Sequence, residues 1–437
     1  MSGRGLILVI VYVVLVCALA GLAAWLGPEG DGFLIQAGRS AGLAGAAILV
    51  VQGALAARWT WTTRPFGLDI VLRFHRWTAT LAGLLLLAHP VLLSAGGHAL
   101  LEGDGLPWYV WAGLGVLVLV LANLAASAYR PTLGLSFERW RFLHAVLGVT
   151  ILAGAFVHGW LAGADFSRPA LQGAWIVLFA AGAVVFVHHR FVGPALRRRR
   201  PWRVTAVTPE TENVWTVELE PPDGRTYDYL PGQFHFLTLH RGRGLPEEEH
   251  HFTVSSSPTR PGRVTSTIKA VGDFTATIGD TRPGDTASVQ GAFGRFSSDL
   301  HPDERDLVFI VGGIGITPII SMLRAMRDRE DDRPVLLLYG NRTQADIVFR
   351  DELAEIEAGG HPRLTVVHVL SRAGKDWTGH TGYVDREILD RYVGDDVTGK
   401  TFYICGPGPM RAKVLANLKA MGVPNGRIRT EIFALVG

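Results

Sequence analysis

Four histidines form two pairs with the same spacing inside apolar stretches of the chain. His75 and His89 bracket the first stretch. His144 and His158 bracket the second, again at a separation of 14 residues. In an α-helix 14 residues rise about 21 Å and return to nearly the same face. Neutral imidazole is a common axial ligand of haem iron, so the matched pairs predict two bis-histidine haem sites. A proton-relay chain of histidines is the alternative, although it does not require matched pairs.

A further charged residue, Arg39, lies about six residues into the second apolar run. A guanidinium at that depth needs an anionic partner or water, and a propionate of the outer haem would be such a partner. If dioxygen accepts the electrons, the same charge would stabilise the superoxide that forms. Arg39 is therefore a candidate catalytic residue. An arginine that snorkels to the membrane surface without a redox role is the alternative.

Apolar helices must position these residues, and six runs of the sequence are long enough to span a bilayer. They are Leu6–Leu26, Phe33–Ala57, Asp69–Ala95, Trp108–Ala128, Trp140–Ala162 and Ala170–His189. The third and fifth runs carry the histidine pairs. An alternative for the first run is a signal peptide, because Arg4 precedes it and Ala18, Leu19 and Ala20 resemble a cleavage site.

Charged residues near the ends of these runs predict how the helices are oriented. Arginines occur in alternate connections and after the last run: Arg58, Arg64, Arg73, Arg76, Arg130, Arg139, Arg141 and Arg197–Arg200. The other connections carry mainly Glu29, Asp31, Glu102, Asp104 and Asp165. By the positive-inside rule we expect a multi-pass protein of the cell membrane with both termini in the cytoplasm. We interpret Arg197–Arg200 as a topology anchor rather than a specific lipid site.

This orientation stacks the two predicted haem sites across the membrane. The third and fifth runs both cross from the cytosol to the outside. His75 and His144 are then expected near the cytosolic leaflet, and His89 and His158 near the outer leaflet. Each level receives one imidazole from each helix, which predicts an electron path from the cytosol to the exterior.

Length and composition limit the number of domains and the classes of partner and cofactor. A chain of 437 residues predicts about two to four domains. Hydrophobic residues make up 48% of the chain and the mean hydropathy is +0.24, with the long apolar runs ending near Arg190. The net charge of +3 is concentrated at membrane edges, which does not indicate a nucleic-acid partner. Cys17 and Cys405 are too few for a disulfide framework or a cysteine-ligated iron–sulfur cluster.

The sequence pattern changes after Trp202. Short alternating runs predict strands separated by turns, and their spacing suggests an antiparallel barrel of about 100 residues. These strands are Val204–Val207, Val214–Leu219, Phe234–Leu239, Phe252–Ser255 and Val264–Ala270. After Pro302, strands alternate with helices, which predicts a parallel, nucleotide-binding sheet. Its elements are strands Leu307–Val311, Val335–Tyr339, Leu364–Leu370 and Thr401–Ile404, with helices near Ile319–Asp328 and Asp346–Glu357.

A glycine-rich turn, Val311–Pro318, joins the first of these strands to its helix. Glycines let the backbone approach a pyrophosphate, and the helix N-terminus attracts negative charge. We expect Thr317 to cap the helix and Pro318 to occupy its first turn. The turn ends in Thr-Pro rather than a third glycine, which argues against the usual dinucleotide fingerprint.

Four motifs together resemble a ferredoxin-reductase-type flavin and nicotinamide module: HHFTVSSSP (His250–Pro258), VGGIGITPI (Val311–Ile319), YGNRT (Tyr339–Thr343) and CGPGPM (Cys405–Met410). With the histidine-paired half, the whole chain resembles the bacterial branch of the NADPH oxidase and ferric reductase family. The resemblance implies a multidomain protein: a six-helix transmembrane bundle, an antiparallel β-barrel FAD domain and an α/β parallel-sheet nucleotide-binding domain. The expected boundaries are 1–196, 197–301 and 302–437.

The resemblance also implies roles for residues of the flavin domain. His250 would contact the flavin diphosphate, Phe252 would pack on the cofactor, and Thr253 would lie near the flavin N5 as a catalytic residue. His251 stands where the family usually has proline, and Ala292 where it often has proline. The other implied flavin-binding residues are Ser255, Ser256, Gly291 and Gly294. Plain turn residues are the alternative for Ser255–Ser257.

In the nucleotide domain the resemblance assigns two segments. The phosphate-binding loop would comprise Gly312, Gly313, Gly315, Thr317 and Pro318, and the segment beside the nicotinamide ring Cys405, Gly406 and Pro407. Cys405 is assigned a catalytic role, with a small buried strand-end residue as the alternative. Phe433 corresponds to a near-terminal aromatic, also assigned as catalytic, that covers the flavin.

A loop after the third strand of the parallel sheet would choose between the nucleotides. Ser371, Arg372 and Lys375 fall where related reductases hold the 2′-phosphate of NADPH, and charge pairing favours a phosphate there. A solvated loop, with NADH as the donor, is the alternative.

The expected activity is transmembrane electron transfer from NAD(P)H through FAD and two haems b. The bilayer and a small acceptor are the expected partners. Dioxygen reduced to superoxide is the first choice, and a ferric chelate the second. A membrane anchor that supplies electrons to an extracytoplasmic protein is the rival from another class. The oligomeric state is not predicted.

Overall fold

The computed structural model describes residues 3–26, 32–97, 107–162, 164–394 and 396–431. They form two compact units, Met1–Gly193 and Pro194–Gly437. The first unit is helical and the second contains two six-stranded sheets. The expected fold class is therefore confirmed, while the finer division at residues 196 and 301 stays a prediction.

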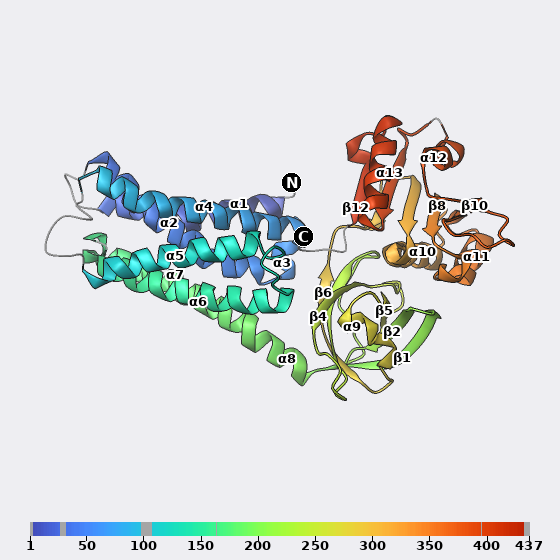
Figure 1. Ribbon diagram of the computed structural model, residues 1–437, viewed down its shortest axis with the longest axis horizontal. Helices are drawn as coiled ribbons and strands as arrows, with labels where there is room; N and C mark the ends of the chain where they lie inside the picture. The colour runs from blue at the N-terminus through green and yellow to red at the C-terminus, as the bar shows by residue number, and fades with distance from the viewer. Residues whose placement is uncertain (1–2, 27–31, 98–106, 163, 395, 432–437) are drawn as a thin grey trace. The chain divides into compact units, whose positions relative to one another are not determined.

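Six long helices lie side by side in the first unit (Figure 1). They are α1 (Gly3–Leu26), α2 (Phe33–Ala56), α4 (Leu68–Ala95), α5 (Trp108–Ala128), α6 (Phe137–Ala162) and α7 (Pro169–Val187). Each begins and ends within three residues of its expected bounds. All six are long and apolar enough to cross a membrane. Shorter elements connect or follow them: α3 (Thr60–Thr63), η1 (Ala164–Ser167), η2 (His188–Val192) and α8 (Gly193–Arg199).

Large apolar side chains cover the outside of this bundle. Val118 on α5 and Phe142 on α6 are 63% and 65% exposed, and Val184 on α7 is 68% exposed. Such exposure would be costly in water over so many residues, but it suits contact with lipid. Within the bundle, α1, α2 and α7 share buried side chains such as Leu19, Leu43 and Trp175.

The first sheet of the second unit is antiparallel, with strand order β4-β3-β6-β1-β2-β5. Its strands are β1 (Trp202–Thr211), β2 (Val214–Glu220), β3 (Phe234–His240), β4 (Glu249–Thr253), β5 (Val264–Lys269) and β6 (Thr286–Phe293). A bridge between Val254 and Ser266 links the end of β4 to β5, the two outer strands. The sheet therefore closes on itself as a barrel around buried side chains such as Val217 and Leu237.

Strand β6 was missing from the sequence expectation, although it lies between β3 and β1 in the middle of the sheet. Its sequence, TASVQGAF, has little apolar alternation. Its place in the sheet comes from pairing with β3 over residues 286–293 and with β1 at Thr286 and Ala287. Tertiary pairing thus overrides a weak local strand signal here.

The second sheet is parallel, with order β10-β9-β8-β7-β11-β12. Its strands are β7 (Asp306–Gly312), β8 (Pro334–Asn341), β9 (Arg363–Leu370), β10 (His380–Thr381), β11 (Lys400–Cys405) and β12 (Ile428–Glu431). The helices are α10 (Ile316–Asp328), α11 (Arg350–Gly359), α12 (Arg386–Val393) and α13 (Gly408–Ala420), and the short α9 (Asp273–Ala276) belongs to the barrel. Apolar side chains fill both faces of the sheet, as a parallel sheet requires.

A buried carboxylate ties three segments of this sheet together. Glu304 lies just before β7 and is 5% exposed. Its Oε2 accepts a 2.6 Å hydrogen bond from the Tyr403 hydroxyl on β11, and its Oε1 accepts one of 2.8 Å from Arg429 on β12. Burial and the adjacent carboxylate raise the pKa of Tyr403, so the hydroxyl stays protonated and donates.

Replacing Glu304 is expected to destabilise the parallel sheet. Glu304→Ala removes the acceptor of the buried Tyr403 hydroxyl and of Arg429 Nη2, at a cost of about 2–3 kcal/mol. We expect the melting temperature of the second unit to fall by about 4–10 °C, measured by calorimetry on the full chain. Glu355→Ala on the exposed face of α11 is the control, and equal melting temperatures for both variants would contradict the assignment.

Candidate functional site

The four paired histidines meet between helices as two facing pairs. His75 on α4 faces His144 on α6, with ring centroids 6.3 Å apart and ring planes at 63°. His89 and His158, on the same two helices, face each other at 6.4 Å and 80°. Each helix thus supplies one imidazole to each pair, as the spacing predicts.

These separations fit a metal ion held between the two rings of a pair. A metal–imidazole bond is about 2.0–2.1 Å long, as for zinc, and an imidazole nitrogen lies about 1.15 Å from its ring centre, given ring bonds near 1.33 Å. Two imidazoles that bind one metal from opposite sides therefore have centroids about 6.3 Å apart. Both pairs match this distance within 0.1 Å.

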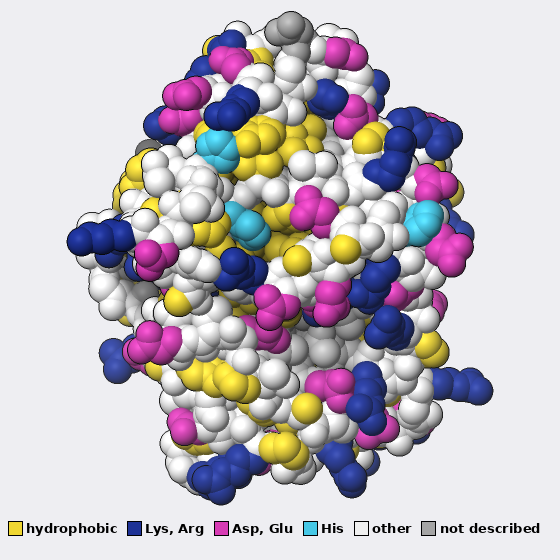
Figure 2. Space-filling view, turned by 90° about the vertical axis from the view of Figure 1, so that its right-hand side faces the viewer, with side chains coloured by type: hydrophobic (Ala, Val, Ile, Leu, Met, Phe, Trp, Pro, Cys, Tyr) yellow, Lys and Arg dark blue, Asp and Glu magenta, His cyan; other side chains and the backbone are white. Residues whose placement is uncertain are grey.

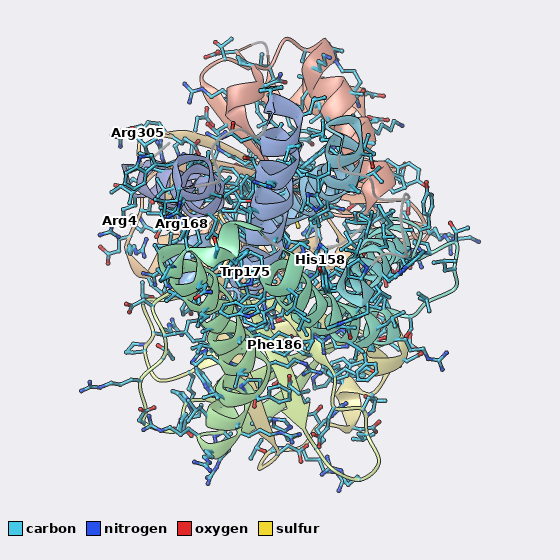
Figure 3. The ribbon with its side chains drawn as sticks, turned by 90° about the vertical axis from the view of Figure 1, so that its left-hand side faces the viewer. Arg4, His158, Arg168, Trp175, Phe186 and Arg305 are labelled. Atoms are coloured by element: carbon cyan, nitrogen blue, oxygen red, sulfur yellow. The ribbon has the colours of Figure 1, made fainter. Side chains whose placement is uncertain are left out.

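At the His89–His158 pair, backbone carbonyls orient both rings. His89 Nδ1 lies 2.8 Å from the carbonyl oxygen of Gly38 on α2. His158 Nδ1 lies 2.8 Å from that of Tyr109 on α5. A carbonyl can only accept, so each Nδ1 carries the proton and each Nε2 keeps its lone pair for a metal. Figure 3 views the bundle along its helices and labels His158 and Trp175, which lie among them.

Glycines provide the space that these two rings occupy. A Cβ at Gly42 on α2 would come within 2.8 Å of His89 Nδ1, and a Cβ at Gly113 on α5 within 2.5 Å of the His158 ring. Small residues allow this close approach of helices inside a membrane protein. A side chain at either position would push the imidazole out of line with its partner.

At the His75–His144 pair the two rings are held differently. His75 is hydrogen-bonded to the backbone of Gln52 on α2. His144 Nδ1 instead lies 2.9 Å from the side-chain oxygen Oδ1 of Asn123 on α5. Trp140, one turn before His144 on α6, stacks on the His144 ring at 5.2 Å. In both cases a neighbouring helix supplies a hydrogen-bond partner of the ring.

The residues fit a haem better than a metal ion bound by protein alone. In the described part of the chain, no group of three or more His, Cys, Asp or Glu residues could hold a metal ion, whereas protein-only zinc sites use three or four such ligands. Two imidazoles would bind the iron of a haem and leave its remaining ligands to the macrocycle. The four histidines are the residues that would hold it.

Arg39 lies on α2 directly after Gly38, the residue whose carbonyl binds His89. This places Arg39 at the level of the His89–His158 pair, as its position in the sequence suggested. Its assignment as a catalytic residue stays a prediction.

The expected flavin residues begin on β4. His250 Nε2 lies 3.0 Å from Glu248 Oε2, and its ring stacks on Phe274 of α9 at 4.3 Å. Phe252 is half-buried and packs against the barrel core. Thr253 is buried at the end of the strand. The barrel thus brings these three residues together at one strand.

The serines that follow β4 order the turn. Ser255 is fully buried, and its Oγ lies 2.9 Å from both Thr265 Oγ1 and Thr267 Oγ1. Ser256 Oγ lies 3.0 Å from the Tyr229 hydroxyl and accepts a 3.1 Å hydrogen bond from the Thr265 amide. The Ser255 hydroxyl thus bonds the face of β5 opposite the core residues Val264 and Ile268, and its role toward a cofactor stays a prediction.

Helix α10, which follows the first strand of the parallel sheet, forms hydrogen bonds with the same turn. Arg324 Nη1 donates a 2.7 Å hydrogen bond to the carbonyl of Ser255, and Ser321 Oγ donates one of 2.7 Å to the carbonyl of Ser256. A two-pronged ion pair with Glu352, at 2.6 and 2.8 Å, fixes the Arg324 guanidinium. Burial opposes the charge of Glu352, but hydrogen bonds from Arg324 outweigh it and lower the pKa of Glu352. No motif in the sequence indicated this contact between the two cofactor segments.

The two glycines assigned to the flavin site here, one on β6 and one directly after it, have structural reasons to be glycine. A Cβ at Gly291 would come within 2.7 Å of His235 Cβ, and Gly294 has a φ of +99°. His235 is fully buried between the Tyr227 hydroxyl at 2.5 Å and Ser266 Oγ at 2.8 Å. Burial lowers the pKa of His235 to about 3, so the ring is neutral and joins neighbouring segments of the barrel.

The glycine-rich turn packs against the end of β11. A Cβ at Gly315 would come within 2.4 Å of the Cys405 carbonyl oxygen, and a Cβ at Gly312 within 2.5 Å of Met410 Sδ. Gly406 lies against Gly312, so the loop and the Cys405–Pro407 segment meet as the resemblance implies. Gly313, with a φ of +54°, opens the turn.

The expected cap by Thr317 was wrong. Helix α10 begins at Ile316, one residue earlier, so Thr317 already lies in the first turn. Its Oγ1 donates to the Ile314 carbonyl at 3.1 Å instead of accepting from a helix amide. Pro318 does occupy the first turn, where its missing amide hydrogen costs nothing.

Cys405 ends β11 and is fully buried. Burial raises the pKa of its thiol well above the usual value, so the thiol is protonated. Its position beside the glycine-rich turn agrees with the resemblance, and its burial agrees with the alternative of a small strand-end residue. Phe433 lies outside the described residues.

The loop that carries Ser371, Arg372 and Lys375 follows β9. Ser371 is anchored through its amide to the Asn341 carbonyl at 3.0 Å, and the Arg372 amide donates to the Arg342 carbonyl at 2.7 Å. The side chains of Arg372 and Lys375 are exposed. Arg342, also exposed at the end of β8, adds a cation at this edge. The motif Tyr339–Thr343 contained it, but no role was assigned to it from sequence.

Comparison with known protein families matches each half of the chain. Residues 41–155 match the ferric reductase like transmembrane component, a segment that includes His75, His89 and His144. Residues 309–415 match the oxidoreductase NAD-binding domain, which includes the glycine-rich turn and Cys405.

Three relatives are similar to parts of the chain. The stachydrine N-demethylase reductase subunit Stc4 of Rhizobium meliloti is 29% identical over 238 residues, 53% of this chain and 66% of that protein. The propane 2-monooxygenase reductase component of Rhodococcus jostii is 32% identical over 239 residues, 53% and 62% of the two chains. The NADPH nitrate reductase of Emericella nidulans is 36% identical over 120 residues, 26% of this chain and 14% of that protein. The chain thus spans less than two thirds of each.

Solved structures similar to this chain include two flavin-containing proteins. One is the FAD/NAD-binding domain of a Vibrio cholerae nitric oxide dioxygenase. The aligned region covers 53% of this chain and 97% of that domain, with a TM-score of 0.48 and 22% identity. The flavohemoglobin of Malassezia yamatoensis covers 92% of this chain and 98% of its own, with a TM-score of 0.48 and 20% identity. From the family matches, the chain is a multi-pass membrane protein that joins a segment similar to the ferric reductase like transmembrane component to a segment similar to the oxidoreductase NAD-binding domain.

Proposed function

We propose that this protein carries electrons from cytosolic NAD(P)H, through FAD and two haems b, to a small acceptor at the opposite face of the membrane. The main support for the proposal is the two imidazole pairs on helices α4 and α6. Within each pair the ring centroids are 6.3 or 6.4 Å apart. When bound, the flavin converts a two-electron donor into single electrons and the haems carry these one at a time.

The chain's own residues would hold and space these carriers. Neighbouring helices hold all four imidazoles: His89, His144 and His158 through Nδ1, and His75 through the Gln52 backbone. The other ring nitrogens would hold the metal from two sides. The pairs are separated by 14 residues along α4 and along α6, or about 21 Å. Protein imidazoles occupy both faces of each site, so an acceptor is reduced without binding at the metal.

Dioxygen giving superoxide is the proposed acceptor. Arg39 supports it, because a guanidinium at the level of the His89–His158 pair would stabilise a new anion there. A ferric chelate is the second candidate, supported by the match to the ferric reductase like transmembrane component. An extracytoplasmic protein that accepts the electrons is the third, and the acceptor experiment below separates it from the other two.

We further propose that both termini and the flavin module are cytoplasmic and that the protein resides in the cell membrane. The arginines of alternate helix connections support this orientation. Nucleic acid is not a proposed partner. On the face shown in Figure 2, Lys and Arg side chains are interspersed with Asp and Glu rather than gathered in one basic patch.

Haem content tests the proposal directly. The purified full-length protein should contain two haems b per chain, with a low-spin spectrum after reduction by dithionite. His144→Ala should remove one haem and stop electron transfer from the flavin, because the remaining pair is about 21 Å further along the helices. His158→Ala should leave one haem that NADPH still reduces. His188→Ala, outside both pairs, should keep two haems, and a wild-type protein without haem would refute the proposal.

The acceptor prediction concerns oxygen reduction. The purified protein with FAD and NADPH should consume oxygen and form superoxide with no other protein present; a requirement for a second protein would favour the docking alternative. Arg39→Ala should slow oxygen reduction and leave haem reduced at steady state, while NADPH still reduces the haems at the wild-type rate. Reduction of a bulky ferric chelate should change less. Equal slowing for both acceptors, with loss of a haem, would make Arg39 a structural partner of the haem.

The nucleotide prediction concerns the loop after β9. Arg372→Ala should raise the KM for NADPH by about 10- to 150-fold, because a charge-assisted contact contributes roughly 1.5–3 kcal/mol. The KM for NADH should stay nearly constant, since NADH lacks the 2′-phosphate. Arg363→Ala, at the opposite end of β9, is the matched control. Equal effects of Arg372→Ala on the KM for both nucleotides would support the alternative, that this loop is a solvated surface.

A further inference from the structure

Two helix pairs, α2 with α4 and α5 with α6, hold their histidines in the same way at one level. The carbonyl that binds His89 belongs to Gly38, and the carbonyl that binds His158 belongs to Tyr109. Four residues after each carbonyl comes the glycine that makes room for the ring. Gly38 and Tyr109 are 71 residues apart, as are Gly42 and Gly113. The pair α2–α4 and the pair α5–α6 are therefore arranged alike around His89 and His158.

At the His75–His144 level the repeat continues in sequence but changes in chemistry. Gln52 and Asn123 are again 71 residues apart. The Gln52 backbone binds His75, and its side-chain amide donates a 2.9 Å hydrogen bond to Thr78 Oγ1. Asn123 instead contacts its histidine through the side chain, since its Oδ1 lies 2.9 Å from His144 Nδ1. His144 is thus held by a replaceable side chain rather than by the backbone.

The surroundings of Asn123 hold it in this position. Its backbone carbonyl accepts a 2.8 Å hydrogen bond from Ser127 Oγ. Ser127 Oγ in turn accepts from Trp140 Nε1 at 3.2 Å, and the Trp140 ring stacks on His144. Ser127 Oγ is also 3.4 Å from His144 Nδ1, but Asn123 Oδ1 is nearer and is the principal acceptor.

We propose that Asn123 is a positioning residue that sets the tautomer and basicity of His144 and thereby lowers the reduction potential of the haem held by His75 and His144. This inference rests on the proposed function, because it requires that haem. An acceptor on the outer nitrogen of an imidazole keeps the proton on Nδ1 and makes the ring a stronger donor through Nε2. A stronger axial donor favours the oxidised metal, and such hydrogen bonds are one of the protein's means of tuning haem.

Two substitutions of Asn123 should shift this potential in opposite directions. Asn123→Leu removes the acceptor at similar size, so the midpoint potential of the His75–His144 haem should rise. Asn123→Asp keeps an acceptor and adds negative charge, so that potential should fall. Loss of such a hydrogen-bond partner typically changes metal affinity or activity by about 10-fold or more. A tenfold change in a one-electron equilibrium corresponds to a shift of about 59 mV in the midpoint potential.

The measurement is a potentiometric titration of the purified full-length protein, followed by visible absorbance. His144→Ala, which retains only the His89–His158 haem, assigns the two midpoints. That second midpoint should not move in either Asn123 variant. Gln52→Leu is the matched control at the repeat-related position, since it leaves the backbone contact to His75 in place, and it should leave both midpoints unchanged.

The outcomes separate this inference from the proposed function. Two haems with midpoints that neither Asn123 variant moves, or that both variants move in the same direction, would overturn the inference and leave the proposed function standing. A wild-type protein that binds no haem would overturn both. If Asn123→Leu loses only the His75–His144 haem, the positioning role of Asn123 is supported, and the Asn123→Asp shift decides the tuning.

Discussion

A neutral imidazole inside a membrane helix must satisfy one ring nitrogen before the other can face a metal, and this constraint shapes the helical unit. Water is absent at that depth, so the partner of Nδ1 must come from the protein. A helix carbonyl already bonded along its own helix still has a free lone pair. Gly38 and Tyr109 use that lone pair for His89 and His158. The neighbouring helices α2 and α5 are therefore as necessary to the site as α4 and α6, which carry the ligands.

Close helix packing follows from the same constraint. A carbonyl on α2 can reach His89 only if the two helices approach closely, and Gly42 makes the approach possible by leaving space for the ring. The same arrangement recurs with Gly113 and His158 on α5 and α6. The rings are then held from behind by backbone and packing. Their separation of 6.3–6.4 Å is built into the helix framework rather than left to flexible side chains.

The second unit solves a different positioning problem, that of bringing two cofactor segments from two sheets together. Ser321 and Arg324 lie three residues apart on α10, on one face of the helix. They bond the carbonyls of Ser256 and Ser255, in the turn that follows β4. Helix α10 itself begins at the glycine-rich turn. One helix thus connects the segment assigned to the nucleotide with the segment assigned to the flavin, and the ion pair with Glu352 keeps Arg324 in place.

Much of this organisation is local and was readable from the sequence. Hydropathy and helix periodicity depend only on neighbouring residues, so the six helices were placed within three residues and the histidine pairs were assigned to shared faces. The motifs likewise identified the two sheets and the glycine-rich turn, because turn chemistry requires particular residues at fixed offsets. These features determined the class of protein and the four residues at its centre.

Contacts between distant segments were decided by the tertiary structure alone. The sequence gives no sign that Asn123 binds His144 through its side chain while Gln52 binds His75 through its backbone. Strand β6 has a weak local pattern and exists through its pairing with β3. Thr317 does not cap α10 because the helix already begins at Ile316, and the Ser255 hydroxyl is bound by Thr265 and Thr267 of β5. For His144 and strand β6 the deciding energy comes from a hydrogen bond or strand pairing with residues distant in the chain, and such contacts leave no periodic trace in the sequence.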